Sequence, residues 1–276
     1  MPPSHGIVER LAALSQSGVP FVCVTMVEAV GSTPQDTGAK MLVTREGLVA
    51  GTVGGGRVEL KAIQHAQAML AQPTADAPQP TAFLEWNLKR DVGMTCGGTV
   101  KLFFETYNHS DWRIVVFGAG HVASELVACL GRLDCHVTCV DSRAEWLDRI
   151  PASGRLRKIC VSELRECVAD LSNDSFVVCM TMGHATDRPI LEEIFRQGRK
   201  FPFLGVIGSK AKRAVLVKEL TAAGVPAEEA AAFHCPIGLE LGTNQPCEIA
   251  ISVVAQLIQE RDRWRNHSSG RATLET

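Results

Sequence analysis

Cys96 lies in a run of small residues, Gly93-Met94-Thr95-Cys96-Gly97-Gly98. Because glycine has no Cβ, backbone amides and other groups can come close to a sulfur atom flanked in this way. Most buried cysteines, by contrast, are surrounded by apolar side chains and act as small, inert hydrophobes. The run therefore indicates a presented thiol, whose chemistry would be metal ligation, sulfur transfer or redox exchange.

The chain has ten cysteines, and their spacing narrows these roles. No Cys-x-x-Cys pair is present, which argues against a structural zinc ribbon and against a thioredoxin-like redox site. Cys135-His136-x-x-Cys139 could supply metal ligands, but it lies in a strand-like run, and we expect its residues to belong to the core. Cys96 is thus predicted to be a soft ligand for a metal or a relay for sulfur.

A second glycine loop, Gly54-Gly55-Gly56, directly precedes a predicted helix over residues 58–71. Successive glycine amides form nests that bind anions, although the Gly-Lys-Ser/Thr ending of a phosphate-binding P-loop is missing. Arg57 could hold a phosphate through two hydrogen bonds, and Glu59 would lie in the first helical turn. The alternative is a glycine hinge followed by a surface arginine and a capping glutamate.

A third glycine loop, Gly118-Ala119-Gly120-His121-Val122-Ala123, follows the apolar run Ile114 to Phe117 and opens a predicted helix. This G-x-G-x-x-A pattern is typical of dinucleotide-binding folds, in which Gly118 would make the tight turn and Gly120 would admit a phosphate. It predicts a Rossmann-like domain that starts near Arg113. His121 could hydrogen-bond a phosphate or a metal oxo group, or cap the helix.

Asp141 ends the next predicted strand, where such folds place an acid on a ribose 2′-hydroxyl. Its carboxylate would repel the 2′-phosphate of NADP, an argument that Arg143 weakens. NAD or a related nucleotide is therefore one candidate ligand, and a Rossmann fold holding another ligand, or none, is the alternative. His184 and Asp187 follow a later strand and are further candidates, although Asp187 could also cap a helix.

Hydrophobic patterning divides the chain into two parts. The first has a helix over 7–17, a strand over 19–27, two short strands on either side of 45–47, and two strands that flank the Cys96 loop. In the second, strands alternate with helices, which favours a parallel sheet covered on both faces. Its predicted elements are 114–117, 122–132, 136–140, 144–149, 175–180, 189–196, 203–207, 210–223 and 246–264.

The predicted fold class is α/β, with an amino-terminal mixed α/β domain over residues 1–108, a Rossmann-like domain over 109–266, and a polar tail over 267–276 that we expect to be disordered. The net charge of −2 and the 5% aromatic content argue against nucleic acid as a partner. We recognise no secretory signal and no membrane-spanning run, and expect a cytoplasmic protein with free thiols.

These residues together resemble the XdhC/CoxI family over residues 8–260. The motifs that carry the resemblance are Gly31-Ser32-Thr33-Pro34, Gly38-Ala39-Lys40-Met41, Gly54-Gly55-Gly56-Arg57-x-Glu59, Cys96-Gly97-Gly98, Val116-Phe117-Gly118-Ala119-Gly120-His121-Val122, Ile207-Gly208-Ser209-Lys210-x-Lys212-Arg213, and Pro236-Ile237-Gly238-Leu239 with Pro246-x-Glu248-Ile249-Ala250. The family combines an XdhC/CoxI domain with a Rossmann domain, in agreement with the predicted boundary.

The resemblance implies an accessory protein for molybdenum hydroxylases rather than a catalyst. Such proteins bind molybdenum cofactor, a molybdopterin phosphate, while a cysteine desulfurase replaces one oxo ligand by sulfur, and they pass it to apo-xanthine dehydrogenase. Many members carry cysteine where this chain has Arg57, which leaves Cys96 as the glycine-embedded thiol. The pterin phosphate suits either the Gly54–Gly56 nest with Arg57 or the Gly118–Gly120 loop.

Two other functions fit parts of the sequence. An NAD(P)-dependent oxidoreductase would use the Gly118 loop and Asp141, although no set of catalytic residues for a hydroxy acid is evident beside it. A nucleotide-sensing regulatory protein would use the same loop without catalysis. The apolar helix over 246–264 could pack on its own sheet or form a homodimer contact.

Overall fold

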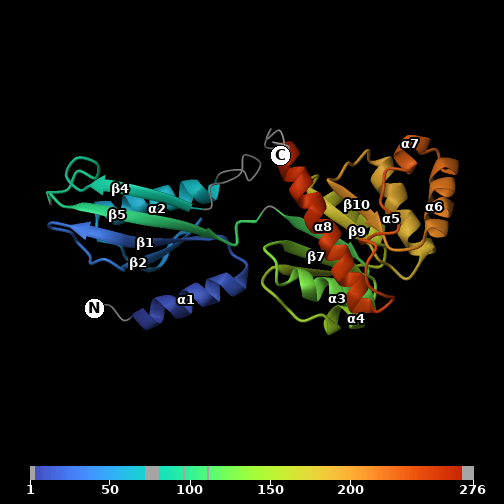
Figure 1. Cartoon of the computed structure of the whole chain (residues 1–276), viewed down its shortest axis with the longest axis horizontal. Coiled ribbons are helices and arrows are strands. Elements are labelled where there is room, and N and C mark those ends of the chain that lie inside the picture. The colour runs from blue at the N-terminus through green and yellow to red at the C-terminus, as the bar shows by residue number, and fades with distance from the viewer. Residues whose placement is uncertain (1–3, 72–80, 96, 111, 269–276) are drawn as a thin grey trace. The chain divides into compact units, whose positions relative to one another are not determined.

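The computed structural model describes residues 4–71, 81–95, 97–110 and 112–268. The chain forms two compact units, Met1–Ser110 and Asp111–Thr276 (Figure 1). Each unit combines helices with one five-stranded sheet. The first unit is mixed α/β and the second has a parallel sheet, so the predicted fold class is confirmed.

The first unit is an antiparallel sheet with strand order β3-β2-β1-β5-β4. Residues of β1 alternate between two cores: Val22 and Val24 belong to the core under α2, and Phe21 and Cys23 to a smaller one beside α1. Its elements are α1 (Ser4–Ser17), β1 (Phe21–Val30), β2 (Lys40–Thr44), β3 (Gly47–Gly51), α2 (Arg57–Ala71), β4 (Thr81–Asn87) and β5 (Thr99–Tyr107).

Helix α2 lies on this sheet because its apolar residues recur at helical spacing. Val58, Ala62, Ala66 and Leu70 are four residues apart, so they line one face, and all four are fully buried. The opposite side is exposed and includes Leu60 and Gln64. This packing fixes the first turn of α2 at the end of the sheet where Gly54–Gly56 enters the helix.

The second unit is a parallel sheet with strand order β10-β9-β6-β7-β8. The chain runs outward from β6 to β8 and then crosses to β9, so the order reverses between β6 and β9, as in doubly wound folds. Its elements are β6 (Arg113–Phe117), α3 (His121–Leu130), β7 (His136–Asp141), α4 (Ala144–Arg149), β8 (Leu156–Cys160), the 3₁₀ helix η2 (Leu164–Asp170), β9 (Ser175–Cys179), α5 (His184–Arg196), β10 (Phe203–Val206), α6 (Lys210–Ala222), α7 (Ala227–Ala230) and α8 (Pro246–Ser268).

Both faces of the central strands are covered. One face of β6 presents Ile114 and Val116 to the core that includes residues of α3 and α8, and the other presents Val115 and Phe117 to the core that includes residues of α5 and α6. All residues of β9 are buried. Continuous burial of this kind distinguishes a central parallel strand from an antiparallel strand with one wet face.

Three elements of the second unit were not predicted: β8, η2 and α7. Strand β8 reads Leu-Arg-Lys-Ile-Cys, and its two adjacent charges obscure the apolar pattern of a strand. Helix α8 continues to Ser268, so the expectation of disorder was wrong for residues 267 and 268. The remainder of the predicted tail lies outside the described residues. Within the described parts, no helix is both long and apolar enough to cross a membrane.

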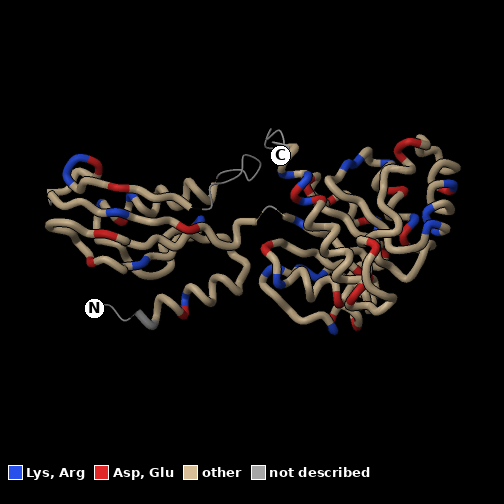
Figure 2. Tube along the Cα trace, in the orientation of Figure 1, with Lys and Arg blue, Asp and Glu red and all other residues tan. Residues whose placement is uncertain are grey.

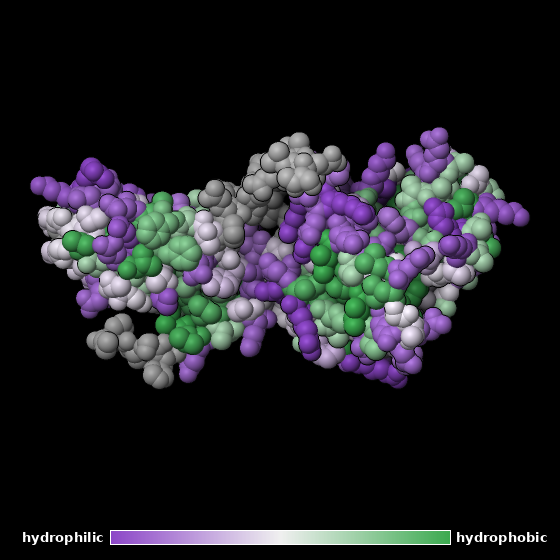
Figure 3. Space-filling model, viewed as in Figure 1, coloured by the Kyte–Doolittle hydropathy of each residue, from purple (hydrophilic) through white to green (hydrophobic). Residues whose placement is uncertain are grey.

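Charged residues of both signs are interspersed over both units, in keeping with the small net charge of −2 (Figure 2). Apolar side chains are also exposed on both units, as the green areas in Figure 3 show. Among them are Phe83 in the first unit, which is 60% exposed, and Ile251 in the second, which is 54% exposed. Single exposed apolar residues of this kind are normal on globular proteins.

Candidate functional site

Three glycine-containing loops meet in the first unit. They comprise residues 31–34 after β1, residues 54–56 before α2, and residues 93–95 with 97–98 before β5. A Cβ added to Gly98 would lie only 2.5 Å from the Ser32 carbonyl oxygen, and one on Gly54 would lie 2.5 Å from the Pro34 ring. The loops, called here the glycine-loop cluster, thus pack so closely that glycine is required at these contacts.

Two basic residues of α2 connect that helix to the loop that precedes β5. The Arg57 guanidinium donates a hydrogen bond to the Gly93 carbonyl. One turn later, the Lys61 ammonium donates to the Asp91 carbonyl at 2.6 Å and lies 4.7 Å from the centre of the Trp86 ring. Arg57 therefore links two of the predicted sites, the glycine nest and the Cys96 segment. Its predicted contact with a phosphate stays a prediction.

Glu59 acts inside the same cluster. Its carboxylate accepts a hydrogen bond from the Thr52 hydroxyl, and the hydroxyl oxygen of Thr52 accepts one from the Gly54 amide at 3.0 Å. The residue expected to cap α2 therefore stabilises the turn that leads into the glycine nest. Gly55 is exposed, and no atom outside its chain neighbours lies within 4 Å of where a Cβ would be, so the middle of the nest is accessible.

Cys96 itself lies outside the described residues. Its neighbour Gly97 is exposed and has open space where a Cβ would be, whereas Gly98 is buried against the loop after β1. Across the described parts of the chain, no group of three histidine, cysteine or acidic residues is placed to hold a metal ion. The predicted role of Cys96 as a metal ligand or sulfur relay stays a prediction.

Cys135 and Cys139 belong to the core, as expected. Both are buried, and burial raises the pKa of each thiol to about 12, with a smaller effect from Asp134 or Asp141. A thiol in that state is neutral at physiological pH and a poor metal ligand. The two cysteines of the Cys135-His136-x-x-Cys139 run are therefore structural.

In the second unit, the glycine fingerprint forms the predicted turn between β6 and α3. Gly118 has a φ of +106°, and a Cβ there would lie 2.3 Å from the Met180 carbonyl oxygen. Its amide donates to the Val140 carbonyl at 2.7 Å. Gly120 precedes the first residue of α3 and has open space at its Cα. Gly118 thus allows the tight turn, and the absence of a side chain at Gly120 leaves space beside the first residue of α3.

Asp141 lies beside this loop, but its carboxylate already accepts four hydrogen bonds from the protein. One oxygen accepts from the Arg143 amide and Nε, both at 2.9 Å, and the other from the Ala119 amide at 2.6 Å and the Arg143 Nη2 at 2.8 Å. A carboxylate offers about four lone-pair sites. A ribose hydroxyl could therefore bind only by displacing one of these bonds, so the geometry does not favour the predicted ribose contact.

The same contacts set the charge of Asp141. Burial raises the pKa of this carboxyl, but hydrogen bonds from the Arg143 side chain and from the Arg143 and Ala119 amides outweigh it, and the net shift is downward. The group is therefore ionised at neutral pH. It connects the glycine loop to the end of β7 by a buried, charge-assisted network.

His121 and three other side chains form a basic and aromatic group next to the loop. The His121 ring meets the Trp146 ring edge-on at 5.0 Å, and the guanidinium carbons of Arg143 and Arg149 lie 4.9 and 4.6 Å from the centre of the Trp146 ring. The contact of His121 is thus with an aromatic ring beside two cations. Its predicted contact with a phosphate or metal oxo group stays a prediction.

The segment after β9 contains a buried ion pair. Asp187 is fully buried, accepts a hydrogen bond from the Thr181 hydroxyl at 2.6 Å and pairs with the Lys212 ammonium at 2.5 Å. His184, the second candidate in this segment, lies 2.6 Å from Glu219 in a partly exposed pair. The sequence placed Lys212 in a family motif, but its pairing with Asp187 is a long-range contact that no local pattern reveals.

A small pocket lies at this carboxyl edge. It measures about 10 Å³ and is lined by Asp141, Arg143, Thr181 and Thr186, among others. That volume accommodates about one water molecule. This pocket does not include the Gly118–Gly120 loop, and the predicted binding of NAD or a related nucleotide there stays a prediction.

Comparison with known proteins identifies the family. The model of the XdhC Rossmann domain matches residues 114–257, more than half of the chain, and that of the XdhC and CoxI family matches residues 14–76. The chain belongs to the XdhC family. The resemblance inferred from the sequence motifs is confirmed. Of the XdhC motifs, the Gly54–Gly56 nest and the Gly118–Gly120 loop fall inside matched segments, and the Cys96 loop lies between them.

Two of the similar proteins are from Escherichia coli. The uncharacterized protein YqeB is 30% identical over 93% of this XdhC-family chain, and the molybdenum cofactor insertion chaperone PaoD is 22% identical over 93% of this chain and 89% of its own length. A protein of Bacillus subtilis described as a probable xanthine dehydrogenase subunit is 28% identical over 55% of this chain. The chain spans 46% and 43% of the lengths of YqeB and the Bacillus protein.

Proposed function

We propose that this chain binds molybdenum cofactor and delivers it to a xanthine dehydrogenase-type apoenzyme. The observation that carries the proposal is the close packing of three glycine-containing loops, one of which belongs to the segment that contains Cys96. The similarity to PaoD, which extends over nearly the whole of both chains, supports the same role.

The chemistry of the glycine-loop cluster suits this cargo. Backbone amides of a glycine nest bind phosphate without a Cβ in the way, and Arg57 at the start of α2 adds a fixed positive charge beside them. A thiol at position 96 would supply the soft sulfur that molybdenum favours. The nest with Arg57, rather than the Gly118–Gly120 loop, is therefore the proposed position of the pterin phosphate.

We further propose that the cofactor is held while a cysteine desulfurase exchanges one oxo ligand for sulfur, and that the chain acts in the cytoplasm as a carrier. In this role Cys96 either contacts molybdenum or relays the sulfur. Both versions require the thiol, and they differ in whether cofactor without the added sulfur is retained by a Cys96 variant.

The test is purification of the full chain from cells that make molybdenum cofactor, followed by assays of molybdenum and pterin per chain. Cys96→Ala is expected to lower the retained cofactor about tenfold, a loss of about 1.4 kcal/mol of binding free energy. Cys160→Ala is the matched control, because Cys160 is an exposed free thiol in the second unit. Equal retention of sulfurated cofactor by Cys96→Ala and wild type would reject the proposed role of the thiol.

A second readout separates binding from delivery. Wild-type chain loaded with cofactor is expected to activate apo-xanthine dehydrogenase in a purified mixture, and the chain without cofactor is not. Absence of both molybdenum and pterin from the purified wild-type chain would reject the cofactor-binding function as a whole.

A further inference from the structure

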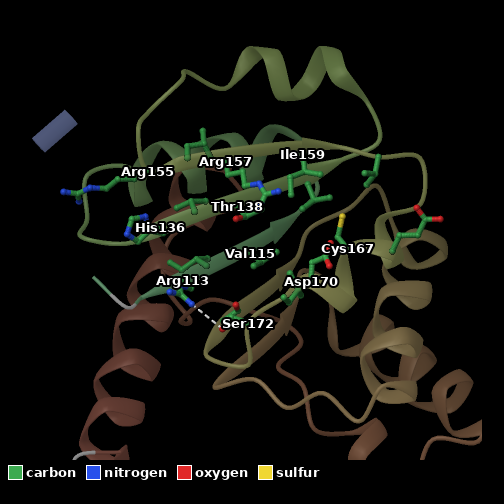
Figure 4. Close-up of a pocket in the computed structure, with 18 of the residues that line it drawn as sticks. Arg113, Val115, His136, Thr138, Arg155, Arg157, Ile159, Cys167, Asp170 and Ser172 are labelled. Carbon is green, nitrogen blue, oxygen red and sulfur yellow. Dashed lines mark hydrogen bonds between the residues drawn. The ribbon is translucent and has the colours of Figure 1, made fainter. Parts of the chain in front are cut away.

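The second unit contains a large hollow on one face of its sheet, away from the glycine fingerprint loop. Its volume is about 670 Å³, and it lies over β6, β7 and β8 (Figure 4). The connection from β8 to β9 explains it. In doubly wound folds a full helix usually covers this crossover, but here η2 supplies only seven residues of 3₁₀ helix. The sheet face beside η2 therefore remains open at the amino edge of β6 and β7 and along β8, whereas Val115 and Val140 are buried.

The side chains on the floor of the hollow lie in rows, because each row consists of residues that are paired between neighbouring strands. Paired residues of neighbouring parallel strands point to the same face. The row at the amino edge contains Arg113 and His136, which are partners across β6 and β7, and the next contains Val115, Thr138 and Arg157. The following row is apolar, with Val140 paired to Ile159. The floor thus changes from basic at the amino edge to apolar further along the strands.

The arginines of the hollow are not equivalent. Arg113 pairs with Asp174 at 3.5 Å, and Arg155 pairs with Asp134 at 3.1 Å. The side chain of Arg157 is exposed and takes part in none of the ion pairs or side-chain hydrogen bonds found among the described residues. Figure 4 shows its side chain extending from β8 over the floor. Arg157 is therefore the cation of the hollow that is best placed to receive an anion.

The opposite wall is formed by η2 and the residues after it. Cys167 is half-buried there, and burial, followed by Asp170 and Glu166, raises the pKa of its thiol, an effect that Arg157 partly offsets. The thiol is neutral at physiological pH, so it forms an apolar wall rather than a nucleophile. The two acidic side chains lie on this wall, which restricts an anionic group to the side of Arg157.

We propose that this hollow binds a small molecule with a flat apolar body and one anionic group. The apolar body would lie on Ile159 and Leu171, which line the hollow and are partly exposed, and the anionic group would pair with Arg157. The volume falls in the range of about 300–1,000 Å³ that is typical of small-molecule sites. This proposal does not depend on the proposed cofactor-binding function, because every lining residue belongs to the second unit.

The probe is 8-anilino-1-naphthalenesulfonate, which combines an aromatic body with one sulfonate and fluoresces in apolar sites. The full chain is titrated and the dissociation constant compared between variants. Arg157→Glu is expected to weaken binding at least tenfold, since it replaces attraction by repulsion. Arg132→Glu is the matched control, because Arg132 is an exposed arginine outside the lining and is expected to leave the constant unchanged. Equal constants for wild type and Arg157→Glu would overturn the proposal.

A second variant tests whether the volume of the hollow, rather than the charge of Arg157, is needed for binding. Cys167→Trp fills the hollow from the η2 side and is expected to abolish binding of the dye while Arg157 is intact. Melting temperatures of all variants confirm that each is folded. Undiminished dye binding by folded Cys167→Trp would likewise overturn the proposal.

Competition identifies the chemical source of the anion. Adenosine monophosphate and an aromatic carboxylate such as 2-naphthoate are each added to the dye complex, and displacement by either in an Arg157-dependent manner supports a small-molecule site. Displacement by an acidic ten-residue peptide at concentrations where neither small anion acts would overturn it in favour of a peptide-binding groove.

Discussion

Asp141 occupies the position of the ribose-binding acid in the sequence motif, but its carboxylate binds groups of the protein itself. The glycine fingerprint and the acid at the end of the next strand are both present, and the sequence pattern predicted a ribose contact on that basis. In the structure Arg143, two residues later, folds back onto the carboxylate, and the Ala119 amide takes the remaining position. The Asp141 carboxylate therefore stabilises the Gly118–Gly120 loop, and its oxygen atoms already accept hydrogen bonds from Arg143 and Ala119.

This arrangement predicts a pH-dependent contribution to stability. Because the folded-state pKa of Asp141 is lowered, ionised Asp141 stabilises the fold at pH values above its ordinary pKa of about 3.9, and the effect is lost as the pH falls through the lower folded-state value. Asp141→Asn is expected to lower the free energy of unfolding by about 2 kcal/mol at pH 7.

Urea unfolding of wild type and Asp141→Asn at pH 7 and at pH 3 measures this difference, which should be smaller at pH 3. Asp148→Asn is the control, since Asp148 is exposed on α4 and its substitution is expected to change stability by less than about 0.5 kcal/mol. A difference between wild type and Asp141→Asn that is equal at the two pH values would contradict the ionic explanation.

At the scale of elements, the glycine-loop cluster depends on contacts between loops that are far apart in the chain. The loop after β1 meets the loop before β5 because β1 and β5 are neighbours in the sheet, with Val30 paired to Thr99. Val30 and Ser32 carbonyls then lie where a Cβ on Gly98 would be. Gly98 is thus needed for packing, whereas Gly97, which has open space, is not.

Gly98→Ala and Gly97→Ala form a matched pair that tests this packing. Gly98→Ala places a methyl group 2.5 Å from a backbone oxygen that cannot move alone, and is expected to cost about 1–3 kcal/mol of unfolding free energy. Gly97→Ala is expected to change it by less than about 0.5 kcal/mol. Thermal or urea unfolding measures both. Equal stability of the two variants would show that the loops do not pack as described.

The same elements show what the sequence could predict. Helix α2, strand β6 and helix α3 followed from apolar periodicity and from glycines at the turns, because these signals lie within about a dozen residues. Other contacts join segments that are distant in the sequence. They are the Arg57–Gly93 hydrogen bond, the Asp187–Lys212 ion pair and the strand pairing of Thr138 with Arg157. Such contacts are set by strand order and register, and a single sequence does not display them.

Strand β8 is the clearest case. Arg157 and Lys158 break the apolar pattern expected of a strand in a covered sheet, and for that reason β8 was not predicted. The reason for the charge is that the face of β8 carrying Arg157 borders the hollow instead of a helix. Arg157, which obscured the strand pattern in the sequence, is thus also the residue proposed to bind the anionic group.

At the scale of the whole molecule, each unit has its own hydrophobic cores. The two cores of the first unit contain only residues before 111, and the two cores of the second contain only later residues. A domain that buries its own core can fold alone. We therefore predict that residues 111–276, expressed without the first unit, form a folded protein with a cooperative thermal transition.

Calorimetry and circular dichroism of this fragment provide the measurement, and the dissociation constant of the naphthalenesulfonate dye should match that of the full chain and remain sensitive to Arg157→Glu. A fragment that begins at Val137 is the control. It lacks β6, which pairs with both β7 and β9 at the centre of the sheet, and is expected not to fold. A fragment 111–276 that melts without a cooperative transition would show that the second unit requires the first for its stability.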